Sequence, residues 1–473
     1  MTPLLGFLPD VDASTPGAII AATNIVPAPN GVAAAPSAVT VAGVPALAAE
    51  CRNAAVATKL DGTRRIFAGS ATDLYELVAG AWTSRATGFA LTSDSRWDFA
   101  QFGDSTLAAA PGVAIQRSTA TTFSAIVGAP QAMAIETAAG FVMAANTNAG
   151  ADVWHCSALY DETDWTPSLS TQSATGQLVS SPGAITALKA FGDQVIVYKE
   201  RSMYIGRYVG TPAVWQFDLI PADVGCVGVD AVTDLGGMGH VIVGRSDIMV
   251  FDGTRPVSIA EGAVRQWFYN DVNPALIYKT IVVHDKQNSV VWIFYPSVTS
   301  SVCDKALVYH LGTKRWGTVT QTVQCALNYV SAGATIGTVV GTIADQPNVS
   351  IGSQYWLAGG RMMTVFSSSN QLSTMNGINA SSSVTLFDVG DDQIVSRLTR
   401  LRVGYQLAPT SATVTGQSRM SRGGVSAGGG SGTYSAGKFD IRQTGRFHRL
   451  TVNAVGSWVA AVVDFDFIKA GNR

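Results

Sequence analysis

A unit of about 45 residues recurs along most of this chain. Each copy contains a turn built on glycine or asparagine, an apolar strand, a second turn, and a strand rich in large apolar side chains. The first turns are centred on Gly62, Gly103, Gly140, Gly192, Gly239 and Asn288. Such repeats are typical of β-propeller blades, because a small antiparallel sheet buries both faces only when blades pack around an axis. The repeat predicts a β-propeller of about six to seven blades, with an array of β-sandwiches as the alternative.

The strands expected after these turns share short runs of apolar side chains. They span residues 65–68, 105–109, 141–144, 194–198, 240–243 and 289–294, with a seventh at 362–366 after Gly360. Second strands are expected at residues 74–77, 203–205, 248–251 and 307–309, and strands that carry a tryptophan at Trp82, Trp165, Trp215 and Trp316. The continuous run Val290–Phe294 fits a strand covered on both faces.

The composition favours the all-β class. Charged residues make up 14% of the 473 residues, and 48 residues are glycine. Few charges with many glycine turns and β-branched residues indicate short packed strands and argue against disorder. The cysteines are too far apart in sequence for a zinc site and odd in number, so we expect reduced, partly buried thiols in a chain made in a cytoplasm. They are Cys51, Cys156, Cys226, Cys303 and Cys325.

Three segments are expected. Residues 1–38 read as an extended N-terminal arm, because prolines interrupt this weakly apolar stretch and no charged leader precedes it. No membrane-spanning segment is expected there. Residues 39–375 contain the repeats. Residues 376–473 lack the repeat and read as a separate small β domain with a sandwich fold. Alternating strands are expected at 397–403, 448–453 and 463–467, with a flexible glycine-rich loop at 423–432.

The charge is unevenly distributed between these segments. Residues 397–473 contain 11 basic and 3 acidic residues, a formal charge of +8, whereas residues 1–396 carry −10. Such an asymmetry indicates an end of the molecule that faces a partner. The candidate basic docking surface consists of Arg397, Arg400, Arg402, Arg442, Arg446, Arg449 and Arg473. A solvated basic face is the alternative, and no nucleic-acid-binding motif accompanies these charges.

The residues that carry chemistry form no recognisable catalytic, cofactor or metal pattern. The histidines at positions 155, 240, 284, 310 and 448 are scattered and are expected to be strand or turn residues. Gly424–Gly428 matches the G-x-S-x-G elbow around Ser426, but a glycine-rich loop is the wrong context for that motif. The acidic residues at 388, 391 and 392 read as a polar turn, and Asp464 and Asp466 as partners of nearby arginines. The carboxylates at 161, 162 and 164 could support glycoside hydrolysis, but no sialidase-type repeat marks the blades. The chain is therefore expected not to be an enzyme and to hold no cofactor.

Several passages of the chain resemble those of one protein family. They are residues 4–10, 23–27, 30–31, 59–69, 74–77, 443–449 and 465–471, together with the final Arg473. In these passages the chain resembles the β-propeller virion proteins of the tail hub or nozzle of tailed bacteriophages. The resemblance spans the chain, but the motifs are short and contain no catalytic signature.

The resemblance implies a structural protein of the virion tail, made in the cytoplasm of a host bacterium. It implies a homo-oligomeric ring, expected to be a hexamer, that lies below the portal and adaptor proteins. Tail fibre or needle proteins would attach to the ring, and duplex DNA would pass through it without sequence-specific contacts. We expect the acidic propeller to help form the channel and the basic end to dock onto neighbours, since strongly basic walls would retain DNA.

Two other functions stay open. A carbohydrate-binding or receptor-binding propeller would carry exposed aromatic side chains clustered on one rim. A glycan hydrolase would hold a close pair of buried carboxylates in a pocket, with shifted pKa values. The propeller fold alone does not decide between these functions, because propellers host many of them.

Overall fold

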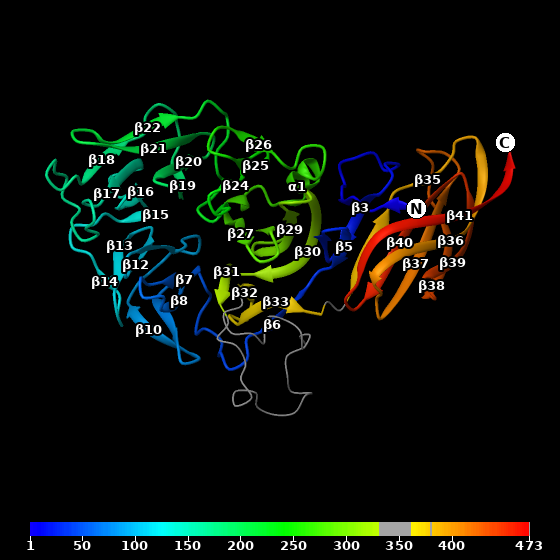
Figure 1. Ribbon diagram of the computed structural model, residues 1–473, viewed down its shortest axis with the longest axis horizontal. Coiled ribbons are helices and arrows are strands. Elements are labelled where there is room, and N and C mark those ends of the chain that lie inside the picture. The colour runs from blue at the N-terminus through cyan, green and yellow to red at the C-terminus, as the bar shows by residue number, and fades with distance from the viewer. Residues whose placement is uncertain (331–360, 379–380, 473) are drawn as a thin grey trace.

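The computed structural model describes residues 1–330, 361–378 and 381–472, and almost all of its regular structure is β-strand. The helical elements of these residues are α1 (Arg265–Asp271) and the short 3-10 helix η1 (Ile277–Lys279). A ring of small sheets forms one end of the molecule and a layered domain forms the other (Figure 1). Among the described residues, no helix is long and apolar enough to cross a membrane.

The ring is a β-propeller. Six separate four-stranded sheets and one further four-stranded meander, β27–β30, follow one another around an axis. In chain order the strands are β7 (Ala54–Thr58), β8 (Arg64–Gly69), β9 (Asp73–Val78), β10 (Ala81–Thr87), β11 (Asp98–Phe102), β12 (Ser105–Ala110), β13 (Val113–Ser118), β14 (Ser124–Ala125), β15 (Ala132–Ala138), β16 (Phe141–Thr147), β17 (Gly150–Cys156), β18 (Ala174–Gln177), β19 (Ile185–Phe191), β20 (Gln194–Lys199), β21 (Met203–Gly210), β22 (Val214–Leu219), β23 (Val232–Asp234), β24 (His240–Val243), β25 (Ile248–Phe251), β26 (Pro256–Ser258), β27 (Ile281–Asp285), β28 (Val290–Tyr295), β29 (Cys303–His310), β30 (Arg315–Val323), β31 (Cys325–Val330), β32 (Arg361–Phe366) and β33 (Leu372–Gly377).

The repeated turn of the sequence is the first hairpin of each blade. Gly62, Gly103, Gly140, Gly192 and Gly239 all have positive φ, a conformation that glycine adopts without steric cost. Each of these glycines, like Asn288, lies between the innermost strand of its blade and the second strand. The apolar strands predicted after the turns are second strands, and the propeller prediction is confirmed. The seventh predicted strand is β32, although Gly360 lies outside the described residues.

The tryptophans occupy less uniform places than predicted. Trp82, Trp215 and Trp316 lie in β10, β22 and β30, each the last strand of its blade. Trp165 does not lie in a strand. It is buried in the connection between β17 and β18, where its indole N–H donates to the Glu162 carbonyl at 2.9 Å.

The N-terminal segment closes the propeller ring. Strand β6 (Ser37–Thr40) pairs antiparallel with β33 and is the outer strand of the last blade. The innermost strand of that blade, β31, lies next to β7 of the first blade. The predicted domain boundaries therefore fall within strands, at residue 39 inside β6 and at residue 375 inside β33.

The C-terminal domain is one curled sheet that folds over into two layers. Its strands pair in the order β5–β41–β36–β39–β38–β37–β40–β34–β3–β2, so that β38 forms the turn between the layers. The bounds are β1 (Thr2–Pro3), β2 (Gly6–Phe7), β3 (Ala18–Thr23), β4 (Ile25–Ala28), β5 (Gly31–Ala34), β34 (Ser382–Leu386), β35 (Val389–Gly390), β36 (Ile394–Leu407), β37 (Ser411–Arg419), β38 (Ala427–Ser435), β39 (Lys438–Gly445), β40 (Phe447–Val455) and β41 (Val459–Asn472). Buried and exposed residues alternate along β37, β39 and β40, as expected for a sandwich-like core.

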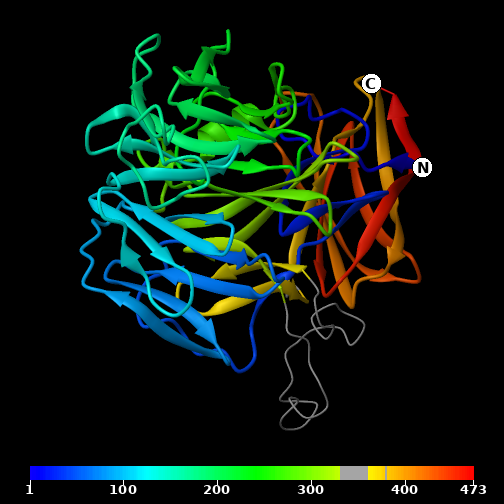
Figure 2. The same cartoon turned by 60° about the vertical axis from the view of Figure 1, so that its left-hand side comes forward.

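The segment predicted as an extended arm is shared between both domains. Strands β1 and β5 pair with β41, and β3 pairs with β34, so they belong to the C-terminal domain. Strand β4 pairs with β30 of the propeller through Thr318 and Ile25. Both views show the chain start lying beside the C-terminal strands (Figures 1 and 2). The N-terminal segment thus ties the two domains together.

The glycine-rich stretch at 423–432 is not a loop throughout. Residues 427–432 are part of β38. A β-carbon on Gly430 would lie 2.5 Å from the Arg442 carbonyl oxygen, and one on Gly432 would lie 2.3 Å from that of Asp440. The glycines are therefore required by a close backbone approach where the sheet folds over, a reason that composition alone does not reveal.

Candidate functional site at the propeller axis

A polar cavity of ≈ 380 Å³ lies where the innermost strands of the blades face the axis. Strands β7, β11, β15, β19, β23, β27 and β31 all contribute to its lining. The polar lining residues are Asn53, Asp98, Glu136, Thr233, Lys189, Asp230, Asp234, His284, Lys286 and Asn328. Charges of both signs therefore meet in a confined space at the centre of the ring.

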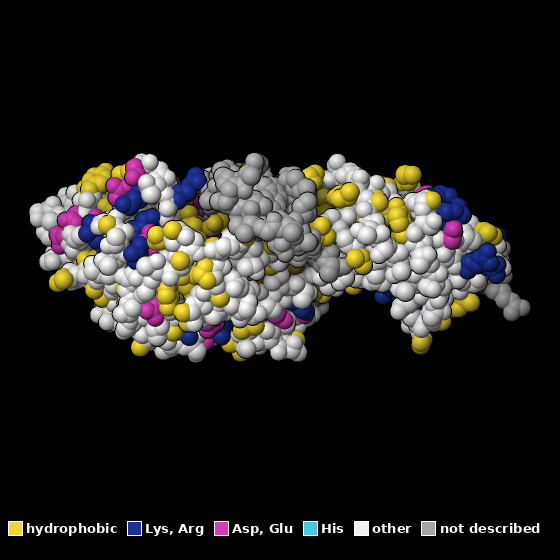
Figure 3. Space-filling view, turned by 90° about the horizontal axis from the view of Figure 1, so that it is seen from below, with side chains coloured by type: hydrophobic (Ala, Val, Ile, Leu, Met, Phe, Trp, Pro, Cys, Tyr) yellow, Lys and Arg dark blue, Asp and Glu magenta, His cyan; other side chains and the backbone are white. Residues whose placement is uncertain are grey.

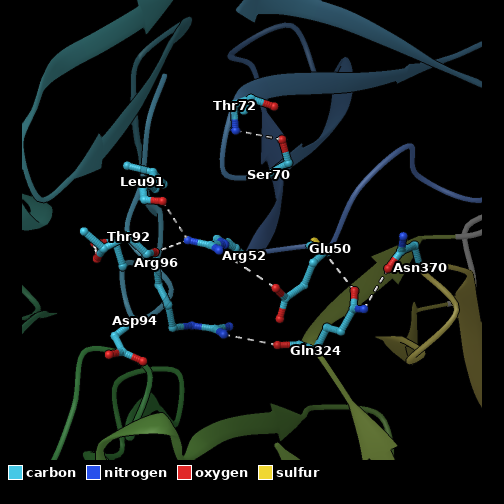
Figure 4. A network of polar contacts seen from close by, with 12 residues as sticks. Glu50, Arg52, Ser70, Thr72, Leu91, Thr92, Asp94, Arg96, Gln324 and Asn370 are labelled. Atoms are coloured by element: carbon cyan, nitrogen blue, oxygen red, sulfur yellow. Dashed lines mark hydrogen bonds and ion pairs between the residues drawn. The ribbon is translucent and has the colours of Figure 1, made fainter. Parts of the chain in front are cut away.

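A hydrogen-bonded network bridges one end of this cavity. Asn53, Arg96, Asp230 and Gln324 each lie one or two residues before the innermost strand of their blades. The Arg96 guanidinium forms an ion pair with Asp230 and donates to the Gln324 carbonyl at 3.1 Å, a bond seen in Figure 4. The Asn53 amide donates to the second Asp230 oxygen at 2.9 Å.

The arginine bridge spans the ring. Arg96 precedes the second blade and Asp230 the fifth, so the ion pair joins blades on opposite sides of the axis. Burial lowers the pKa of Arg96, but the Asp230 charge outweighs this effect and leaves the pKa raised. The Arg96 side chain therefore stays protonated and crosses the ring beside the cavity.

A second cluster of charged side chains is formed by Asp98, Glu136 and Lys189, which lie on the innermost strands of the second, third and fourth blades. Asp98 accepts the Ile135 N–H at 2.9 Å, and the Lys189 ammonium lies 3.9 Å from a Glu136 carboxylate oxygen. Burial raises the pKa of Asp98 to about 7, although Lys189 acts in the opposite direction. Burial lowers the pKa of Lys189, but Asp98, Glu136 and Asp230 outweigh it, so the net shift is upward. Lys189 stays protonated while Asp98 exchanges its proton near neutral pH.

His284 lies in β27 of the sixth blade and also lines the cavity. Burial lowers its pKa, so the imidazole is neutral at neutral pH. Its carbonyl accepts the Asn328 amide at 2.8 Å and thereby links β27 to β31. In the parts of the chain that the structure describes, no group of three or more His, Cys, Asp or Glu side chains could hold a metal ion.

Sequence reasoning missed this cavity. Its key groups come from four separate connections, and Arg96 and Asp230 are 134 residues apart. A signal was available, because each of Asn53, Arg96, Asp230 and Gln324 is a polar residue just ahead of an innermost strand. Aligning the blades on their innermost strands, rather than on their glycine turns, would have brought these positions together.

The predicted basic residues fall into two groups in the C-terminal domain. Arg400 and Arg402 lie in β36 and pair with acidic residues of the neighbouring strands, at 2.8 Å to Asp440 and 2.8 Å to Asp466. This confirms the expected arginine partners of Asp466. Arg397 and Arg442 are exposed in β36 and β39. Dark blue side chains lie on the end of the molecule that this domain forms and also on the propeller end (Figure 3).

Arg446 and Arg449 lie in other parts of the same domain. Arg449 of β40 forms a two-pronged ion pair with the partly buried Asp388, with distances of 2.7 and 2.8 Å. Arg419 pairs with the same carboxylate. Arg446 lies between β39 and β40, with a guanidinium nitrogen 3.5 Å from the Met420 carbonyl oxygen. Arg473 lies outside the described residues.

The structure also places the histidines, the G-x-S-x-G match and the acidic residues at 161, 162 and 164. All five histidines lie in strands, as predicted. Strand β38 begins at Ala427, so a strand rather than a helix follows Ser426, and the elbow motif lacks its required context. Glu162 pairs with Arg117 at 2.8 Å and accepts the Ser105 hydroxyl at 2.5 Å. Asp161 and Asp164 accept backbone N–H groups within their own turns.

Comparison with known proteins gives likenesses of fold. No family model matches the chain, and no curated protein matches it in sequence. Among solved structures, YCF48 bound to D1 peptide is similar at 13% identity over 62% of this chain and 86% of that chain, with a TM-score of 0.36. The extracellular domain of BT4673 from B. thetaiotaomicron, described as a hybrid two component system, is similar at 9% identity over 77% of this chain and 43% of that chain, with a TM-score of 0.44.

The buried carboxyl of Asp98 predicts a pH-dependent contribution to stability. Its pKa of about 7 lies above the ordinary value of 3.8, so between these values the unfolded chain releases a proton that the folded chain keeps. Stability from this group therefore falls as pH rises from 4 to 7 and levels off above 7. In Asp98→Asn this loss is absent, and we expect the variant to gain about 3–4 kcal/mol relative to wild type over that range.

Urea unfolding of both proteins at closely spaced pH values checks this prediction. Comparing the two proteins removes the effect of the buried histidines, which titrate in both. Wild-type and Asp98→Asn curves that run parallel from pH 4 to 8 would contradict it.

Proposed function

We propose that this chain is a structural virion protein that forms a ring in a phage tail, the nozzle or hub. The ring would connect portal and adaptor proteins to fibre or needle proteins and conduct genome DNA during ejection. The observation that carries the proposal is the family resemblance of passages at both ends of the chain. Parts of those passages lie in strands of one domain, since residues 6–7 form β2, residues 443–449 run from β39 into β40, and residues 465–471 lie in β41.

The axial cavity supports a DNA path between copies rather than through one propeller. A cavity of ≈ 380 Å³ is far too small for duplex DNA, and the ion pair between Arg96 and the lining residue Asp230 crosses the ring. Opening it would separate a buried ion pair, which costs several kcal/mol. A conduit built from this chain would therefore need several copies arranged around a wider opening.

The charge distribution supports docking through the C-terminal domain. Residues 1–396 carry −10 and residues 397–473 carry +8. Within the basic part, Arg400 and Arg402 are already paired with carboxylates. The exposed Arg397 and Arg442 are therefore the better candidates for contact with an acidic partner surface.

Reversing these two charges tests the docking proposal. We expect Arg397→Glu combined with Arg442→Glu to weaken ring assembly or adaptor binding at least tenfold, because like charges would then face the acidic partner surface. The fold should be retained, since both side chains are exposed. Binding is measured by analytical ultracentrifugation with purified adaptor protein, over a series of salt concentrations.

A matched control carries the same change of charge on the propeller. Arg64 and Lys314 are also exposed and basic, at the start of β8 and in the β29–β30 turn. Arg64→Glu with Lys314→Glu should leave assembly unchanged. Equal effects from the two double variants, or none from either, would overturn docking through the basic end.

A carbohydrate-binding or receptor-binding propeller is the second candidate, and one surface feature favours it. Tyr160 is 77% exposed and lies over Gly140, while Tyr208 is 39% exposed and its ring lies 5.2 Å from that of Phe141. Exposed tyrosines beside one hairpin can stack on sugar rings. Binding on a glycan array that is lost in Tyr160→Ala, in a chain that stays monomeric, would favour this function over the tail ring.

A further inference from the structure

Two cysteine thiols meet where the propeller ring closes. Cys51 lies in the connection from β6 to β7, and Cys325 is the first residue of β31. Their sulfur atoms are 3.3 Å apart, and the side chains are 1% and 0% exposed. One thiol thus belongs to the start of the first blade and the other to the innermost strand of the last blade.

Hydrogen bonds hold both cysteines in this position. The Cys51 N–H donates to the Gln324 side-chain oxygen at 2.9 Å, and the Gln324 amide donates to Asn370 at 2.7 Å (Figure 4). The Gln324 backbone N–H donates to the Phe366 carbonyl at 2.8 Å. Gln324, which precedes Cys325 in the sequence, therefore also holds Cys51 in place, and the fold keeps the two sulfur atoms close.

The other three cysteines are placed differently. The thiols of Cys156, Cys226 and Cys303 contact the carbonyl oxygens of Gln172, Gly228 and Lys279 rather than another sulfur. The pairing of Cys51 with Cys325 is thus specific among cysteines that are all buried and free.

We propose that Cys51 and Cys325 form a disulfide that closes the propeller covalently at its seam when the chain meets a low-molecular-weight disulfide oxidant such as oxidised glutathione. One cysteine thiolate attacks a sulfur of the oxidant and releases one glutathione thiolate. The second cysteine then attacks the mixed disulfide, loses its proton and releases the other glutathione. Two protein thiols are oxidised and one glutathione disulfide is reduced to two thiols.

The bond would act at the junction where the ring closes. There the chain joins the first blade to β6, and β6 is held in the last blade by its pairing with β33 and not by a direct chain connection. Since 274 residues separate the two cysteines, the bond would restrict a long loop of the unfolded chain. This inference is independent of the proposed function.

Burial controls when the bond can form. Burial raises the pKa of Cys325 well above its ordinary value of 9.0, so the thiol stays protonated in the closed ring. The thiolate is the reacting species, and the oxidant must also reach it. Oxidation should therefore be slow in the closed ring and fast when the seam opens or while the chain folds.

The test uses the full chain. The protein is exposed to oxidised glutathione in mild urea, returned to buffer, and digested without reduction for peptide mapping by mass spectrometry. We expect a linked peptide pair that contains Cys51 and Cys325, with the other three cysteines free. We also expect the Tm of the oxidised protein to exceed that of the reduced protein by about 5 °C.

Two variants separate this bond from general effects of oxidation. Cys51→Ser should lose the linked peptide and the difference in Tm between oxidised and reduced samples, whereas Cys303→Ser should keep both. The comparison is made within each variant, so a change in its basal stability does not affect the result. Five free cysteines in the treated wild type, a link between other cysteines, or a Cys51–Cys325 link without a rise in Tm would overturn the proposal.

Discussion

Replacing Asp230 with alanine is expected to lower the free energy of unfolding of the propeller by about 3–5 kcal/mol, because it leaves the Arg96 guanidinium buried without its counter-charge. The two side chains are 18% and 12% exposed for Arg96 and Asp230. One guanidinium nitrogen of Arg96 already lacks a hydrogen-bond partner, so the loss falls on a group with few alternatives. Urea unfolding followed by tryptophan fluorescence measures the effect.

Neighbouring variants distinguish the buried pair from a general sensitivity of this region. Asp94 lies two residues before Arg96 and pairs with Lys279 at 3.3 Å while 56% exposed, so Asp94→Ala should cost at most about 1 kcal/mol. Asp230→Ala combined with Arg96→Met should recover part of the loss, because no unpaired charge remains. Equal losses in the free energy of unfolding from Asp94→Ala and Asp230→Ala would show that the Arg96–Asp230 pair stabilises the propeller no more than a surface ion pair does.

Substituting alanine at Gly31 is expected to destabilise the C-terminal domain by about 3 kcal/mol or more. Gly31 begins β5 with a φ of +148°, and a β-carbon there would lie 2.1 Å from the Ala460 carbonyl oxygen. Because that oxygen belongs to the backbone of β41, the clash cannot be relieved by rotating a side chain. The N-terminal segment would have to move away from β41, and thermal unfolding should show a lower Tm.

Gly43 provides the control for backbone strain alone. Its φ is +76°, but a β-carbon there would have no neighbour within 4 Å. Gly43→Ala should therefore cost only about 1–2 kcal/mol, from the left-handed conformation. If Gly31→Ala were no worse than Gly43→Ala, the packing of the N-terminal segment into the C-terminal domain would be contradicted.

The propeller was predictable because its signal is local. Each glycine turn and the strand after it lie within a few residues of one another, and the positive φ of Gly62 or Gly140 is a property that glycine alone adopts readily. The innermost strands were harder to predict. Strand β23 has three residues, and other innermost strands carry charged residues such as Asp98 and Lys189 that line the axial cavity.

Features that depend on contacts between distant parts of the chain could not be predicted from the sequence. The pairing of Arg96 with Asp230, and of β6 with β33, depends on how many blades the ring has, and no local pattern states that number. The glycines of β38 looked like a loop because their purpose is a close approach to β39, which only the folded sheet reveals. Likewise Cys51 and Cys325 looked isolated until ring closure brought them into contact.

The oligomeric state of the purified chain tests the central proposal most directly. It is measured by native mass spectrometry and negative-stain imaging, alone and with purified portal and adaptor proteins. A tail ring predicts a closed assembly, expected to be a hexamer, with an axial opening wide enough for duplex DNA and lying between copies. A chain that stays monomeric with both partners present would contradict the proposal.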